Sequence, residues 1–166
     1  MTEDTAATTE VPGPRDPAPK TAGAPPAAGH LGGTAEREAT GDQVKVTLPA
    51  EGAYLSVLRT ATAGLAARLD FTLDEIEDLR IAVDEACAML LAQAIPGTNL
   101  ECAFDLDADE MAITVSVVTT QPRTPARDTF AWTVLSALAG TVDSRLGPDD
   151  QVSIVLRKRR QAQRSG

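Results

Sequence analysis

The sequence has few of the residues that build metal sites and disulfides. Its 166 residues include one histidine, His30, and two cysteines, Cys87 and Cys102, which do not form a CxxC pair. Zinc sites usually combine several Cys and His ligands, so no metal site is expected. Both cysteines lie in apolar periodic segments, and we expect them to be reduced core thiols.

Long apolar runs and positive charge are also scarce. No stretch approaches the ~20 apolar residues of a membrane helix. The N-terminus, MTEDTAATTE, has no basic stretch followed by an apolar one, so no signal peptide is expected. These absences predict a soluble, cytoplasmic protein with no membrane partner. With a net charge of -9, direct nucleic-acid binding is not expected either, because phosphate contact needs a positive surface.

Large apolar residues are nearly missing from residues 1–42, where Pro, Gly, Ala and Thr dominate. Such a segment cannot bury enough surface to offset its chain entropy, so it is predicted to be a disordered tail. The folded domain is expected at residues 43–160. A short basic C-terminal tail, 161–166, is expected to follow it.

Hydrophobic periodicity within the domain predicts seven elements. The expected strands are QVKVTLPA, NLECAFDLD, EMAITVSVVTT and QVSIVLRKR, and RLGPDD is expected to be a turn. Helices are expected at about 53–69, from Thr72 to before Pro96, and at about 128–139. Thr72 with Glu75 forms the capping-box pattern at the start of the second helix. The order β-α-α-β-β-α-β predicts a two-layer α+β sandwich, with helices on one face of a four-stranded mixed sheet.

The second helix raises a question because the acidic pair Asp84-Glu85 interrupts its apolar run, RIAVDEACAMLL. On a helical wheel the apolar stripe is centred on Ile76, Val83 and Leu90. The opposite face carries Asp78, Ala82, Glu85 and Met89. One interpretation is that this face is simply exposed to solvent. The other is that it belongs to a functional site.

The element order, together with LDFTLDEIEDLRIAVDEACAML at residues 69–90, resembles the anti-sigma factors of the RsbW type. These belong to the histidine-kinase-like ATPase superfamily, whose nucleotide pocket defines the Bergerat fold. The resemblance covers about residues 44–160. It implies that Glu85 matches the family's general base for phosphoryl transfer. Met89 stands where the family has a Mg²⁺-ligating asparagine, and a thioether is a poor ligand for an ion that prefers oxygen.

Two other nucleotide motifs of the family are altered. Thr119 stands at the adenine-binding aspartate of the family's D-x-G-x-G motif, and Gln121 at its first glycine. The glycine-rich lid is replaced by RTPARDTFAW, which has no glycine to let backbone N–H groups cradle phosphate. Asp128, near the third helix, would repel phosphate from that helix N-terminus. The resemblance therefore implies a pseudokinase without resident ATP or Mg²⁺, whose degenerate pocket is formed by Glu85, Met89, Thr119 and Gln121.

The resemblance also implies partners. Family members hold an alternative sigma factor away from RNA polymerase, and an arginine on the first helix pairs with acidic residues of that sigma factor. Arg59 falls at the matching position, with Tyr54 and Leu55 as neighbouring contacts; the alternative is that Arg59 is an ordinary exposed helix charge. Further implied partners are an anti-anti-sigma factor of the STAS type, a second copy of the chain, and a small ligand in the degenerate pocket.

Three functions stay open at this point. The first is an anti-sigma factor with little or no kinase activity. The second is an active ATP-dependent serine kinase of the same family, which phosphorylates an anti-anti-sigma factor. The third is an α+β domain with no sigma partner. Arg59 and the helix that carries Glu85 are the features that favour the first two over the third.

Overall fold

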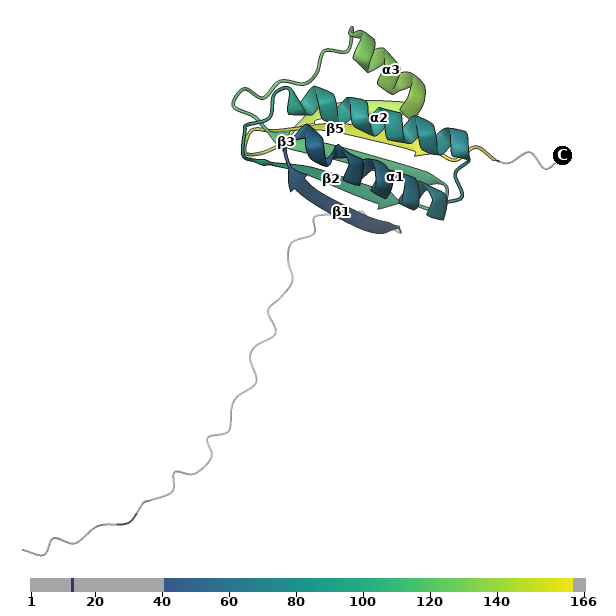
Figure 1. Cartoon of the computed structure of the whole chain (residues 1–166), viewed down its shortest axis with the longest axis horizontal. Coiled ribbons are helices and arrows are strands. Elements are labelled where there is room, and N and C mark those ends of the chain that lie inside the picture. Colours follow the sequence, from purple (N-terminus) through teal and green to yellow (C-terminus); the bar gives the residue numbers. More distant parts are fainter. Residues whose placement is uncertain (1–12, 14–40, 163–166) are drawn as a thin grey trace, which may run out of the picture. The chain divides into compact units, whose positions relative to one another are not determined.

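The computed structural model describes Gly13 and residues 41–162. A five-stranded sheet carries three helices on one face (Figure 1). The strands are β1 (Asp42–Pro49), β2 (Asn99–Leu106), β3 (Glu110–Val118), β4 (Thr141–Leu146) and β5 (Gln151–Arg159). The helices are α1 (Leu55–Arg68), α2 (Leu73–Leu91) and α3 (Phe130–Ala139), and a 3-10 turn, η1 (Gly52–Tyr54), precedes α1. Most of the tail predicted at 1–42, and the last four residues of the one predicted at 161–166, lie outside the described residues.

The predicted two-layer α+β architecture is confirmed, but the predicted sheet was incomplete. The strand order is β1-β2-β3-β5-β4, and every neighbouring pair is antiparallel, so the sheet has five strands and is not mixed. The missed strand is β4: the sequence analysis ended the third helix at about 139, assigned residues 145–146 to a turn and predicted no strand between them. β4 lies at the sheet edge and has no fully buried residue. An edge strand of this kind lacks the strong alternation that reveals a strand in a sequence.

The core lies between the sheet and the helices. Alternate residues of the three central strands point inward, and Phe104, Ile113 and Ile154 have no exposed surface. The opposite face of the sheet carries mainly polar and small residues, such as Lys45, Glu101 and Thr114. On this face the hydroxyl groups of Ser116 and Ser153 lie 2.8 Å apart in a hydrogen bond. This alternation is what an antiparallel sheet with one covered face requires.

Helix α2 is buried on three sides, against the sheet, α1 and α3. Its predicted stripe is confirmed as buried, but Ala82, which was placed on the opposite face, also has no exposed surface. Asp78, on the same side as Ala82, accepts a hydrogen bond from Lys158 Nζ at 2.9 Å, and that ammonium also donates to the Leu138 carbonyl of α3 at 2.7 Å. The solvent side of α2 instead carries Glu77, Ile81 and Ala88.

The N-terminus of α2 holds the end of β5. Thr72 and Glu75 form the predicted capping box, in which Glu75 Oε2 accepts from the Thr72 backbone N–H at 2.8 Å. The other carboxylate oxygen accepts from the Gln161 backbone N–H, also at 2.8 Å. Burial by itself raises the pKa of Glu75, but the N–H groups of Gln161 and Thr72, the Thr72 hydroxyl and the charge of Lys158 outweigh it and lower that pKa below 4.5. The ionised form of Glu75 therefore stabilises the fold.

We expect Glu75→Gln to lower the free energy of unfolding by about 1–3 kcal/mol at pH 7. The amide keeps one acceptor, so one of the two backbone N–H groups faces an NH₂ group. Because the folded-state pKa is lowered, the wild-type advantage is complete above the ordinary value of 4.5 and is lost as the pH falls through the folded-state pKa. Urea denaturation at pH 7 and pH 4 measures both effects. The matched control is Glu77→Gln, which removes only an exposed pair with Arg80. Equal losses of unfolding free energy in the two variants would contradict the stabilising role of the bonds from Glu75 to Thr72 and Gln161.

Candidate functional site

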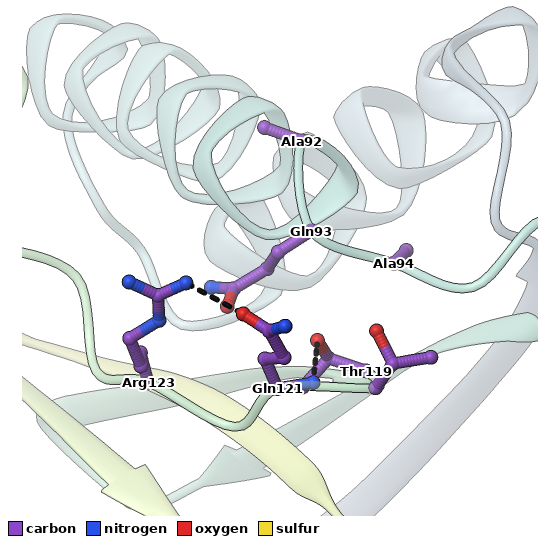
Figure 2. Close-up of a pocket in the computed structure, with 7 residues that line it drawn as sticks. Ala92, Gln93, Ala94, Thr119, Gln121 and Arg123 are labelled. Atoms are coloured by element: carbon purple, nitrogen blue, oxygen red, sulfur yellow. Dashed lines mark hydrogen bonds between the residues drawn. The ribbon is translucent and has the colours of Figure 1, made fainter.

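A hollow of about 420 Å³ lies at the end of α2, where it meets the segment that follows β3 (Figure 2). Its walls are formed by Ala92, Gln93, Ala94, Thr119, Thr120, Gln121 and Arg123. Two residues of the predicted degenerate pocket, Thr119 and Gln121, are thus brought together here. Its walls do not include the other two, Glu85 and Met89.

Thr119 has a structural use at the position where the resemblance implies an adenine-binding carboxylate. Its side chain is buried, and its hydroxyl accepts from the Gln121 backbone N–H at 3.2 Å. Its own backbone N–H donates to the Asp150 carbonyl at 3.0 Å. The Gln121 side chain accepts in turn from Arg123 at 2.8 Å, as Figure 2 shows. These bonds hold the turn after β3. Because residue 119 is a threonine, there is no carboxylate here to bind an adenine amino group.

The two α2 residues of the predicted pocket are half-buried. Met89 packs against the hydrophobic core, so its thioether contributes apolar contact. Glu85 lies one turn before it on the same helix. Among the described residues there is no group of three or more His, Cys, Asp or Glu side chains that could hold a metal ion.

The segment that replaces the family's lid is pinned by Arg127. Its guanidinium donates to Asp143 Oδ1 on β4 at 2.7 Å and lies 5.1 Å from the centre of the Trp132 ring on α3. The hydrogen bond from Arg127 is the main reason why the pKa of Asp143 lies below its ordinary value. Where a flexible glycine-rich loop would close over phosphate, this chain has a loop fixed by an arginine.

The residues present do not fit Mg-ATP. Thr119, at the position that the resemblance assigns to the adenine-binding carboxylate, is buried and engaged in a turn. Met89, at the position that the resemblance assigns to the Mg²⁺ ligand, packs on the core. The position of the lid has no glycine and is held by an ion pair. No step of phosphoryl transfer follows from this arrangement.

Both cysteines are free and buried, which confirms the expected core thiols. Burial, with a smaller contribution from the charge of Asp84, raises the pKa of the Cys87 thiol to about 12. Burial also raises the pKa of Cys102. Because thiolates are the reactive form, neither cysteine is suited to oxidation or nucleophilic chemistry at neutral pH.

A second candidate site lies along the seam between α1 and α2. Arg59 Nε lies 3.3 Å from Asp84 Oδ1, and the two side chains are 43% and 37% exposed. Burial raises the pKa of Asp84, and the charges of Arg59 and Arg80 offset this only in part. The sequence analysis selected Arg59 but assigned no role to Asp84. The pairing joins two helices, so no spacing within either helix could have revealed it.

Apolar side chains are exposed on both helices, although Val57, two residues before Arg59, lies on the opposite flank of α1. Tyr54 and Val57 at the start of α1, and Ile81 on α2, are each 42–50% exposed. A shallow hollow of about 450 Å³ on α1 is lined by Ser56, Val57, Thr60 and Ala61. Leu55, by contrast, is half-buried and packs against the core. The predicted contact residues Arg59 and Tyr54 are therefore accessible, and Leu55 is accessible only in part.

Three comparisons relate this chain to known proteins. No family model matches the sequence. The "Anti-sigma-F factor RsbW" of two Mycobacterium tuberculosis strains is 33% identical over 101 residues, which are 61% of this chain and 60% of the relative. The "Serine-protein kinase RsbW" of Halalkalibacterium halodurans is 36% identical over 90 residues, 54% of each protein. The chain thus spans roughly half to 60% of the length of these relatives.

A solved structure shows the same fold. The crystal structure of the RsbU and RsbW domains of a Mycobacterium tuberculosis protein matches 72% of this chain and 32% of that chain, with a TM-score of 0.56 and 14% identity. The predicted resemblance to RsbW-type proteins is confirmed by the sequence similarity, and the expected fold by this structure. In the described part of the chain, no helix is long and apolar enough to cross a membrane.

We expect Arg127→Ala to raise the pKa of Asp143 toward its ordinary value, because the hydrogen bond from Arg127 is the largest cause of the lowered pKa. NMR titration of the aspartate side chains measures the change. Arg145→Ala is the matched control, since Arg145 approaches the same carboxylate only at 3.6 Å and should move the pKa less. An unchanged Asp143 pKa in Arg127→Ala would show that the loop is not pinned as described.

Proposed function

We propose that this protein is an anti-sigma factor that binds an alternative sigma factor and keeps it from RNA polymerase. The observation that carries the proposal is the 33% identity over 101 residues to proteins named anti-sigma-F factor RsbW. The chemistry of the site supports a binding function, because the nucleotide-handling positions hold residues that pack or brace the fold. The α1–α2 seam is the surface on which the predicted contact residue Arg59 is accessible.

The seam has the composition of a protein-binding surface. Arginine and tyrosine are the residue types that most often dominate interface energetics, and here Arg59 and Tyr54 are both accessible. Ile81 on α2 adds exposed apolar surface. Val57 and the hollow next to it lie on the other flank of α1 and are not part of the proposed contact. We place the sigma-factor contact on this surface, with Arg59 paired to an acidic side chain of the sigma factor.

Release of the sigma factor requires a second partner or signal. We propose that an anti-anti-sigma protein of the STAS type competes for the same surface. The hollow at the end of α2 is the proposed site for a ligand other than ATP, because Gln93, Thr120 and Arg123 supply polar groups around it. A homodimer is a further proposal, for which the described residues provide no specific contact.

An active serine kinase is the second candidate function. Its support is the name of the Halalkalibacterium halodurans relative, "Serine-protein kinase RsbW". A second support is Glu85, which stands at the position of the family's general base. Against it stand Thr119, Met89 and the pinned loop. Binding of ATP decides between the two, because a switch kinase has to bind its phosphoryl donor.

We expect Arg59→Ala to weaken binding of the sigma factor by at least 1 kcal/mol, about fivefold in Kd, and Arg59→Glu to weaken it further. The sigma factor is identified by pull-down from the native cells and purified, and its affinity is then measured by calorimetry. The control is Arg68→Ala, which removes an exposed arginine at the other end of α1. Equal affinities of wild type and Arg59→Ala would remove Arg59 from the interface. Failure of the wild type to bind any sigma factor would overturn the proposed function.

We expect no thermal stabilisation by ATP, with or without Mg²⁺, up to millimolar concentration. A ligand at 100 times its Kd would stabilise the fold by about 2.7 kcal/mol, so micromolar binding would be evident as a raised melting temperature. Stabilisation is not expected because Met89 offers no oxygen ligand for Mg²⁺ and Thr119 offers no carboxylate for adenine. A clear Mg²⁺-dependent shift would favour the kinase. The same assay, run with other small metabolites, tests the ligand proposed for the hollow.

A further inference from the structure

The α1–α2 seam concentrates polar atoms that lack hydrogen bonds. Within the described part of the chain, the buried side-chain atoms without a hydrogen-bond partner are Arg59 Nε, Arg80 Nε, Asp84 Oδ1 and Ser144 Oγ. The first three belong to this one seam. Buried polar groups are nearly always paired, and an unpaired one is costly. Arg59 Nε and Asp84 Oδ1 face each other at 3.3 Å, so they form an ion pair without hydrogen-bond geometry.

The contact between Arg59 and Asp84 is an incomplete ion pair. Arginine and carboxylate groups commonly form two parallel hydrogen bonds of about 2.7–2.9 Å. Here the Nε and Oδ1 atoms approach only to 3.3 Å, and neither makes a hydrogen bond. Both side chains are more than a third exposed. Separating an ion pair of this kind costs little free energy, so either partner can readily bind another charged group instead.

Arg80 gives the Asp84 carboxylate a second positive neighbour. Its charge acts on Asp84 together with that of Arg59, and its Nη1 donates to Glu77 at 2.6 Å on the solvent side of α2. When Arg59 turns outward, Asp84 is therefore not left without a compensating charge.

We propose that Asp84 is an internal competitor for Arg59, which occupies the guanidinium in the free protein and is displaced by an acidic side chain of the bound sigma factor. This inference rests on the proposed function, because it concerns the same contact. Displacement has a free-energy cost that lowers the affinity for the sigma factor. Asp84 thereby keeps the complex weak enough for a competing protein to release it. It acts through Arg59 and need not touch the sigma factor.

The test is a double-mutant cycle with the full chain and the purified sigma factor. Affinities are measured by calorimetry for wild type, Asp84→Asn, Arg59→Ala and the double variant. We expect Asp84→Asn to bind about 2- to 5-fold tighter than wild type, the effect of losing one partly exposed ion pair. In the Arg59→Ala background, Asp84→Asn should leave the affinity unchanged, because the residue it competes for is gone.

Asp74→Asn is the matched control, since Asp74 is an exposed acid on the same helix and its loss changes the net charge equally. It should not change the affinity. Asp84→Ala is the second variant should Asp84→Asn fold poorly, and thermal unfolding of each variant verifies the fold.

Several results would overturn the inference while the proposed function stands. One is unchanged or weaker binding of the sigma factor by Asp84→Asn. Another is tighter binding that persists in the Arg59→Ala background, because Asp84 would then repel the sigma factor directly. Equal tightening by Asp74→Asn would also overturn it, because a general charge effect would then suffice. If the wild type binds no sigma factor, the proposed function and this inference both fail, and that measurement comes first.

Discussion

The burial of α2 on three sides is the constraint on which the rest of the structure depends. Most helices of a two-layer fold bury one stripe, but α2 packs against the sheet, α1 and α3. Lys158 of β5 joins α2 and α3 through Asp78 and the Leu138 carbonyl. With its orientation fixed in this way, α2 presents Glu75 to the end of β5 and Asp84 to α1, and the chain leaves its C-terminus at the hollow that Gln93 lines.

Features set by neighbouring residues were predictable from the sequence, and features set by distant ones were not. The capping box at Thr72 and Glu75, the apolar stripe of α2 and the alternation of β2 and β3 each depend on residues a few positions apart. The bond from Lys158 to Asp78 joins residues 80 positions apart, and the bond from Gln161 to Glu75 joins residues 86 apart. No local pattern encodes such pairs. For the same reason, Ala82 was placed on the face opposite the apolar stripe, although its contacts bury it.

The candidate site shows a similar division. The sequence identified Thr119 and Gln121 as altered nucleotide positions, and both line one hollow. It did not reveal what those residues do instead. Thr119 closes a turn, Met89 fills core space and Arg127 ties the neighbouring loop to β4 and α3. Each side chain has a stabilising contact in place of a catalytic one, a pattern that fits a fold maintained for its outer surface.

Arg127 also lies over Trp132, which is the single tryptophan of the chain and is almost entirely buried on α3. Indole emission depends on nearby charge and on access of water. The chain therefore carries its own optical reporter beside the loop that follows β3. A rearrangement of that loop or of α3 would change the fluorescence of the unlabelled protein, so motion there can be followed in solution without an attached dye.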